Sequence, residues 1–106
     1  MTRSIWLALS LIIMAPLAAN DDISSNRQQE LRNLLVQDCG SCHGLTMRGG
    51  LGPALLPTVL KGKSTEYLSS VILNGRPGSA MPAWRSLLSP AEARWMADRL
   101  LQGKLQ

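Results

Sequence analysis

The stretch DCGSCHG, residues 38–44, constrains this chain more than any other, because it holds both cysteines and the only histidine. Cys39 and Cys42 are separated by two residues, and His43 follows directly. Four kinds of site bring two thiols and an imidazole this close: a disulfide, a zinc site, a thiol redox centre and a covalent heme attachment site. The remaining sequence has to decide among them.

Three of these interpretations fit poorly. A disulfide between Cys39 and Cys42 would close a very small loop and so restrict the unfolded chain little. A zinc site needs about four ligands, and no second Cys/His pair exists to complete one. A thiol redox centre of the Cys-x-x-Cys type sits on a strand–helix scaffold, whereas no strand pattern occurs here.

The fourth interpretation explains the spacing. Cys-x-x-Cys-His is the attachment signature of c-type heme, in which two thiols add to two vinyl groups on one porphyrin edge and the histidine binds the iron. The chain has no Phe, and beyond residue 19 its only aromatic residues are Tyr67, Trp84 and Trp95. Aromatic side chains normally supply much of a core's buried area. We therefore predict one covalent heme c held by Cys39 and Cys42, with its large apolar face filling the core.

Residues 1–19 differ from the rest of the chain. Arg3 is their only charge, and the eleven-residue apolar run Ile5–Ala15 ends in small residues before the acids begin. This layout is typical of a secretory signal peptide cleaved after Ala19. An uncleaved anchor is the alternative, but a spanning helix needs about 20 apolar residues. We expect a periplasmic cytochrome domain at residues 20–106, with no membrane span after signal removal.

The net charge of +4 is mild. No stretch combines clustered Lys/Arg with interleaved aromatics, which argues against a nucleic-acid partner. The charge suits a soluble monomer that docks on an acidic redox partner. Five basic residues fall in or beside the loops that would flank the heme: Arg48, Lys61, Lys63, Arg76 and Arg85. They form either a basic rim that orients such a partner or an ordinary solvated surface.

Three segments have the apolar spacing of helices: 28–36, 65–73 and 90–102. Ser64 is a candidate N-cap for the second, while Ser89, Pro90 and Glu92 give the third a capping box, and Gly103 ends it. The expected inner faces are Leu31, Leu34 and Leu35; Tyr67, Leu68, Val71 and Ile72; and Ala93, Met96, Ala97 and Leu100, flanked by Trp95 or Leu101. The fold class is therefore all-α.

Two loops separate these helices. Residues 44–63 are rich in glycine and contain two prolines, so no long helix or strand can run through them, although one turn near 58–60 is possible. Residues 75–84 are similarly interrupted. Residues 20–26 are polar, and we expect them to be frayed. Loops this long in a small domain should wrap around something.

No second histidine exists to bind the iron, and methionine is the usual partner of histidine in electron-transfer hemes. Met47 lies only four residues after His43, on the same segment of chain, and cannot easily reach the opposite face of the heme. Met96 belongs to the apolar stripe of the last helix and should be core. Met81 sits in a stiff Pro/Gly loop far enough along the chain to wrap the ring, and Pro82 holds it extended. We predict His43 and Met81 as the axial pair.

The segments CGSCHG, GLGPAL and GSAMPAW, followed by an amphipathic final helix, resemble small bacterial class I c-type cytochromes over nearly all of residues 20–106. The resemblance implies an all-α fold whose terminal helices cross over one heme edge, with axial ligation by His43 and Met81. It also implies that the carbonyl of Pro53 accepts a hydrogen bond from His43. More narrowly, the chain resembles the small periplasmic cytochromes encoded beside the heme-containing nitrite reductase of denitrifying bacteria.

With both axial positions filled, the iron can only cycle between two oxidation states, so we expect an electron carrier and not an enzyme. The resemblance implies service to nitrite reduction, either as donor to the reductase or as electron acceptor in maturation of its special heme. Two alternatives stay open: a sensor or peroxidase-like protein with a displaceable Met81, and a thiol redox protein without heme. Trp84 is expected to pack on the heme, or else to assist electronic coupling to a partner.

Overall fold

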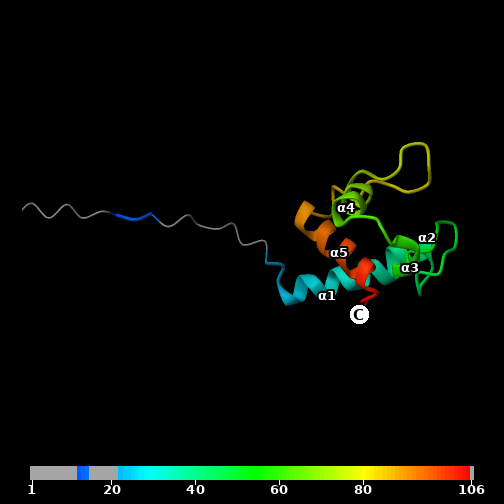
Figure 1. The fold of residues 1–106 in the computed structure, drawn as a ribbon, viewed down its shortest axis with the longest axis horizontal. Coiled ribbons are helices and arrows are strands. Elements are labelled where there is room, and N and C mark those ends of the chain that lie inside the picture. Colours follow the sequence, from blue (N-terminus) through cyan, green and yellow to red (C-terminus); the bar gives the residue numbers. More distant parts are fainter. Residues whose placement is uncertain (1–11, 15–21, 106) are drawn as a thin grey trace, which may run out of the picture.

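A computed structural model describes residues 12–14 and 22–105, and every regular element in these residues is helical. The elements are α1 (Ser25–Leu34), the π-helical turn η1 (Leu35–Cys39), α2 (Gly40–His43), α3 (Pro57–Leu60), α4 (Thr65–Asn74) and α5 (Pro90–Gln102). Figure 1 shows α1 passing beside α5, with α4 on the other side of α5. The predicted all-α class is confirmed.

The first helical path is longer than the sequence pattern predicted. It begins at Ser25, because the side chain of Ser24 accepts a hydrogen bond from the backbone N–H of Arg27 at 3.2 Å. The prediction of a frayed segment over 20–26 was therefore wrong for its last residues, where an unrecognised N-cap satisfies an N–H group of the first turn. The path then continues through η1 and α2 to His43.

The π-helical turn η1 ends at Cys39, the first cysteine of the motif. Such turns add a residue to an α-helix and are frequent at functional sites. Leu31 and Leu35 are both fully buried in the core, whereas Cys39 and Cys42 line a cavity. Because the turn adds one residue to the helix, the two cysteines do not continue the side of the helix that carries Leu31 and Leu35.

The last helix is the centre of the packing. Its predicted capping box is present, with Ser89 Oγ accepting from Glu92 N and a Glu92 carboxylate oxygen accepting from Ser89 N. Gly103 ends it in the left-handed conformation. α5 contacts α1, α3 and α4. Its predicted inner face is confirmed, since all four members are buried: Ala93, Met96, Ala97 and Leu100.

The apolar stripe of α4 was predicted less accurately. Leu68 and Ile72 are buried, together with Leu73, which the stripe had omitted. Tyr67 was expected inside, but 45% of it is exposed. Its hydroxyl accepts a hydrogen bond from Arg76 at 2.8 Å, so the ring stays at the surface, where its polar end has a partner.

Arg27, in the first turn of α1, connects this helix to the last helix, α5. Its guanidinium bonds the carboxylates of Glu92 and Glu30 and donates to the carbonyl oxygen of Leu87 at 3.1 Å. The Arg27 hydrogen bond is the largest cause of the lowered pKa of Glu92. This carboxylate therefore serves both the cap of α5 and the contact between α1 and α5.

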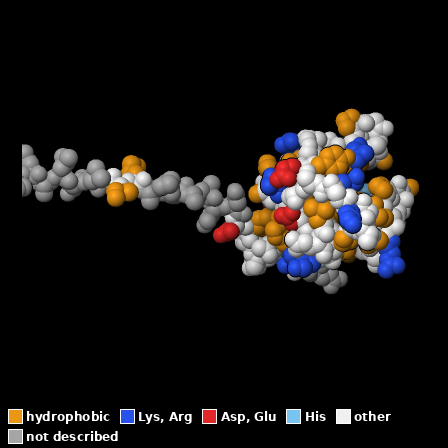
Figure 2. All heavy atoms as spheres, viewed as in Figure 1, with side chains coloured by type: hydrophobic (Ala, Val, Ile, Leu, Met, Phe, Trp, Pro, Cys, Tyr) orange, Lys and Arg blue, Asp and Glu red, His pale blue; other side chains and the backbone are white. Residues whose placement is uncertain are grey.

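The signal peptide predicted at residues 1–19 lies outside the described residues, apart from residues 12–14. Within the described ranges, no helix combines the length and the apolar character that a membrane crossing requires. Lys and Arg side chains lie in separate places across the face seen in Figure 2, between apolar and neutral groups. They do not gather into one continuous basic surface on that face.

Candidate functional site

One cavity of about 510 Å³ lies between the motif helix, the two loops and α4. Its size falls within the roughly 300–1,000 Å³ typical of cofactor and small-molecule sites. Cys39, Cys42, His43 and Met81 all line it, so the structure brings the four principal predicted residues together. Pro53 and Trp84 line it as well. Most of the wall between these groups is aliphatic.

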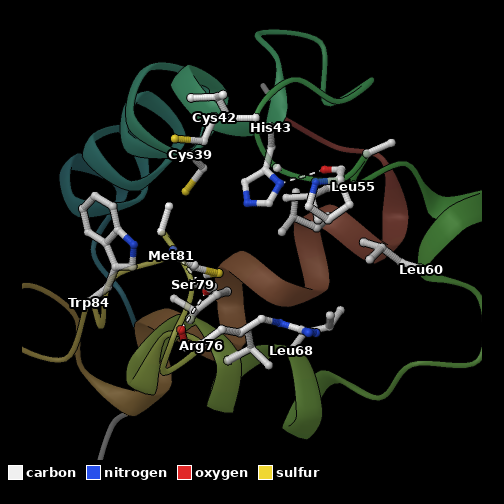
Figure 3. A pocket seen from close by; sticks show the side chains of 18 of the residues that line it. Cys39, Cys42, His43, Leu55, Leu60, Leu68, Arg76, Ser79, Met81 and Trp84 are labelled. Atoms are coloured by element: carbon white, nitrogen blue, oxygen red, sulfur yellow. Dashed lines mark hydrogen bonds between the residues drawn. The ribbon is translucent and has the colours of Figure 1, made fainter.

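The two cysteines occupy one side of the cavity and are not joined by a disulfide (Figure 3). Cys42 is exposed and Cys39 is partly buried. Burial, helped by the nearby charge of Asp38, raises the pKa of the Cys39 thiol to about 11. A redox or nucleophilic cysteine needs a lowered pKa to form thiolate. The environment of Cys39 therefore does not favour the thiol redox alternative.

The imidazole of His43 is held by the backbone of the first loop. Its Nδ1 lies 2.7 Å from the carbonyl oxygen of Pro53. A carbonyl oxygen can only accept a hydrogen bond, so Nδ1–H is the donor and the proton of a neutral ring sits on Nδ1. Nε2 is then left with its lone pair available to a metal, which is the arrangement that orients metal-binding histidines in general.

Backbone hydrogen bonds place Pro53 beside the ring. The N–H of Gly52 donates to the carbonyl of Cys42, and the N–H of Gly49 donates to the carbonyl of His43, each at 2.8 Å. These two carbonyls end the motif helix and have no partner within it. The loop therefore caps the helix and at the same time brings the carbonyl of Pro53 to Nδ1.

Gly52 is a site residue that the sequence analysis missed. A Cβ atom built on it would lie 2.7 Å from Cε1 and 2.8 Å from Nδ1 of His43. Only a residue without a side chain lets the loop backbone lie against the imidazole at this distance. The signal was present in GLGPAL, but a glycine in a glycine-rich loop does not by itself indicate what it touches.

Met81 approaches the cavity from the second loop, across from His43 (Figure 3). Its carbonyl accepts a hydrogen bond from Arg76 N at 3.2 Å, and its N–H donates to Ser79 Oγ at 3.3 Å. Gly75 starts the loop with φ of +65°, and a Cβ there would lie 2.6 Å from the carbonyl carbon of Pro82. The loop can therefore close only over a glycine at residue 75.

The other two candidate methionines lie elsewhere. Met47 and Met96 are 1% and 0% exposed, and both belong to the hydrophobic core. Neither lines the cavity. The assignment of Met96 to the core is confirmed, and the position of Met47 explains why it is not available to the cavity.

Trp84 is half-buried, packs against the core and lines the cavity beside Met81 (Figure 3). The backbone N–H of Trp84 donates to the carbonyl of Ile72 at 3.1 Å. The backbone N–H of the next residue, Arg85, donates to the carbonyl of Leu73 at 3.2 Å. These bonds attach the second loop to the end of α4. The contact with the core favours a packing role for the indole, which stays a prediction.

The donor set fits a heme. Two thiols on one side, an imidazole with free Nε2 and a thioether opposite it surround an apolar space. A zinc site would need a fourth ligand beside the two thiols and the imidazole, and no group of three or more His, Cys, Asp or Glu side chains suited to a metal occurs in the described ranges. An all-α fold with this cavity and these four groups is that of a class I c-type cytochrome.

Comparison with known proteins agrees with this class. Residues 26–98 match the family described as cytochrome c oxidase, cbb3-type, subunit III, and the chain belongs to this family of c-type cytochromes. The chain is 49% identical to cytochrome c55X of Pseudomonas aeruginosa over 98% of its length and 89% of the relative. It is 53% identical to cytochrome c55X of Paracoccus denitrificans over 91% of this chain and 93% of the relative.

A solved structure, the c-type cytochrome NirC, has a TM-score of 0.76 and 53% identity, covering 78% of this chain and 98% of that one. The chain is also 34% identical to the dihydro-heme d1 dehydrogenase of Pseudomonas aeruginosa, covering 94% of this chain but only 19% of that protein. The protein described here therefore carries covalently bound heme c and belongs among the electron-transfer cytochromes.

Proposed function

We propose that this protein is a periplasmic electron carrier that serves nitrite reduction, with no catalytic activity of its own. The observation that carries the proposal is the position of His43 and Met81 on opposite sides of one cavity. If both bind the iron, no coordination position remains for a substrate. The heme then supplies a one-electron couple, whose potential methionine ligation raises.

In this proposal, each residue of the site has a separate task. Cys39 and Cys42 form the two thioether bonds, and His43 and Met81 provide the axial nitrogen and sulfur. Pro53 keeps the proton of His43 on Nδ1 through the 2.7 Å hydrogen bond and thereby directs Nε2 into the cavity. Trp84 packs at the methionine side and shields the thioether from water.

The relatives support the link to nitrite reduction. Cytochrome c55X and NirC are the names of proteins about half identical to this chain. The sequence resemblance described above implies a cytochrome of the kind encoded beside the heme-containing nitrite reductase. That reductase is the proposed partner. Residues 1–19 are the proposed signal peptide for export, and the mature protein acts as a monomer in this proposal.

The direction of electron flow has a second candidate. A segment of the dihydro-heme d1 dehydrogenase resembles 94% of this chain, and the solved complex of that dehydrogenase matches 66% of it at a TM-score of 0.61. A dehydrogenase has to pass electrons to an acceptor. The likeness therefore favours acceptance of electrons during maturation of the special heme, beside donation to the reductase.

The ligand set can be tested by absorption spectroscopy of the purified holoprotein. Methionine-ligated ferric heme has a weak far-red absorption band, and we expect Met81→Ala to abolish it and to let the ferrous protein bind carbon monoxide. Met96→Leu is the matched control, because it removes another methionine but conserves volume in the core. A wild-type protein without the band would contradict the proposal, as would a band that survives Met81→Ala.

The partner can be tested by stopped-flow mixing. We expect the reduced protein to exchange an electron with the nitrite reductase, or the oxidised protein to accept electrons from a dihydro-heme d1 dehydrogenase turning over its substrate. Transfer with only one of them decides the direction. Absence of transfer with both would remove the link to nitrite reduction while leaving the electron-carrier assignment intact.

A further inference from the structure

The charges in the cavity wall are unevenly placed. Among the described residues that line it, Lys63 and Arg76 are the only lysine and arginine, and both belong to the α4 side. Lys63 directly precedes Ser64, the N-cap of α4, and Arg76 directly follows its C-cap Gly75. The one acidic lining residue, Asp38, is next to Cys39 on the other side.

The two cations converge on one phenol. The guanidinium of Arg76 donates a hydrogen bond of 2.8 Å to the hydroxyl of Tyr67, in the first turn of α4. The ammonium of Lys63 lies 5.7 Å from the centroid of the same ring. The three side chains therefore form one polar cluster at the exposed rim of an otherwise aliphatic wall.

Neither cation has an acidic partner among the residues that the structure describes. The ion pairs in the described ranges involve Arg27 and Arg94, and none includes Lys63 or Arg76. Two positive charges close to one another repel, so their convergence costs free energy unless an anion lies between or beside them. A bound group with carboxylates would remove this repulsion and would gain charge-assisted hydrogen bonds.

A heme tethered at Cys39 and Cys42 presents such carboxylates at this rim. The vinyl groups that become thioethers project from one part of the porphyrin edge, and the two propionates project from the part facing away from them. Figure 3 shows Arg76 on the side of the cavity facing away from Cys39 and Cys42. The charges also balance, because two propionates meet two cations.

We propose that Lys63, Tyr67 and Arg76 bind the two propionate carboxylates of the heme. The inference rests on the proposed attachment through the cysteine motif. Arg76 offers a planar fork suited to a carboxylate, Lys63 offers a point charge, and the Tyr67 hydroxyl, which accepts from Arg76, still has its own proton to donate. The propionates stay at the surface, where the desolvation cost of their charge is low.

The same cluster links the propionates to the axial methionine. The backbone N–H of Arg76 donates to the carbonyl of Met81 at 3.2 Å, and its carbonyl accepts from both N–H and Oγ of Ser79. A propionate held by the guanidinium would thus stabilise the loop that carries Met81. Arg76 is in this respect a positioning residue for Met81.

The test is the pH dependence of the reduction potential of the holoprotein. An opposite charge within hydrogen-bond range lowers a carboxylate pKa by about 1–3 units. We expect Lys63→Gln and Arg76→Gln each to move the propionate inflection to higher pH by about one unit or more. The propionate bending band in the resonance Raman spectrum should shift in both variants. Tyr67→Phe should give a smaller shift in the same direction.

Lys61→Gln and Arg48→Gln are matched controls, since they remove the same charges from exposed residues outside the cavity wall. Equal shifts in Lys61→Gln and Lys63→Gln would overturn the proposal, because the effect would then be long-range charge alone. An unchanged inflection in Arg76→Gln would overturn it as well. Loss of covalent heme stain or of the far-red band in wild type would instead contradict the proposed attachment and ligation. Arg76→Lys and Tyr67→Phe carry the same test if Arg76→Gln does not mature.

Discussion

The Nδ1–H of His43 donates a 2.7 Å hydrogen bond to the carbonyl oxygen of Pro53, ten residues further along the chain. The bond joins the end of the motif helix to the loop that covers it. Because the Gly52 N–H also bonds the carbonyl of Cys42, the loop and the helix are fastened at two neighbouring points. Backbone atoms thus decide the orientation of the imidazole. Substitutions that move this backbone should therefore alter the ligation of the iron by His43.

Gly52→Ala tests this arrangement. The new methyl would lie 2.7 Å from the imidazole, so the ring or the loop must move. Disturbing the partner that orients a metal-binding histidine typically weakens metal binding or activity by about 10–100-fold. We expect a lowered yield of holoprotein and an altered axial-ligand spectrum. Gly62→Ala is the control: its φ of +86° brings backbone strain, but its methyl meets nothing within 4 Å and does not touch the imidazole. An equal change of the axial-ligand spectrum in the two variants would contradict the prediction.

Gly75→Ala tests the second loop. Its φ of +65° is unfavourable for alanine, and the methyl would also collide with backbone atoms of Met81, Pro82 and Ala83. A residue forced into such a conformation costs about 1–3 kcal/mol. We expect partial or complete loss of the far-red band and a lower denaturation midpoint.

Gly78→Ala provides the comparison for the loop, because its φ is +78° but open space surrounds it. This variant should lose stability from backbone strain alone and keep the band. A Gly75→Ala protein with an unchanged band would show that the loop holds Met81 by other means.

The contact between Arg27 and Glu92 predicts that the fold loses stability at acid pH. The folded-state pKa of Glu92 is lowered from its ordinary value of 4.5, chiefly by the Arg27 hydrogen bond. A lowered folded pKa contributes stability that is present above pH 4.5 and is lost as pH falls through the folded value. Glu92→Gln removes this contribution and weakens the capping box, which we expect to cost about 1 kcal/mol at neutral pH.

Urea unfolding of wild type and Glu92→Gln as a function of pH measures the effect. The free-energy difference between the two proteins should be constant near neutrality and should shrink below pH 4.5. A difference that stays constant down to the lowest pH at which both proteins fold would mean that the charge of Glu92 contributes nothing.

Removal of both thiols should cause loss of the fold as well as of the cofactor. Without the heme, the apolar wall of the cavity of about 510 Å³ would face water instead of the porphyrin, and the buried apolar area that stabilises the fold would be lost. We expect Cys39→Ala/Cys42→Ala to lack heme stain on a denaturing gel and to show reduced helicity by circular dichroism. A fully helical, cooperatively unfolding double variant would contradict the role of the heme as core.

The positions of the helices were largely predictable because local signals mark them. The capping box at Ser89 and the glycine at residue 103 define α5, and its buried face follows from apolar spacing. The start of α1 was missed because the Ser24 cap lies in a polar stretch that resembles a frayed end. Tyr67 was misplaced because periodicity does not report that its hydroxyl has a partner nine residues away in the next loop.

By itself, the sequence determined the chemistry of this protein: two thiols and a histidine at heme-attachment spacing, and a methionine in a stiff loop after them. Those are properties of residue type and local order, which a chain carries before it folds. The tertiary structure alone decided which glycines let backbone lie against the imidazole and the methionine loop, and which cations meet at the rim. These are contacts between segments distant along the chain, and only the packing of the helices brings them within reach.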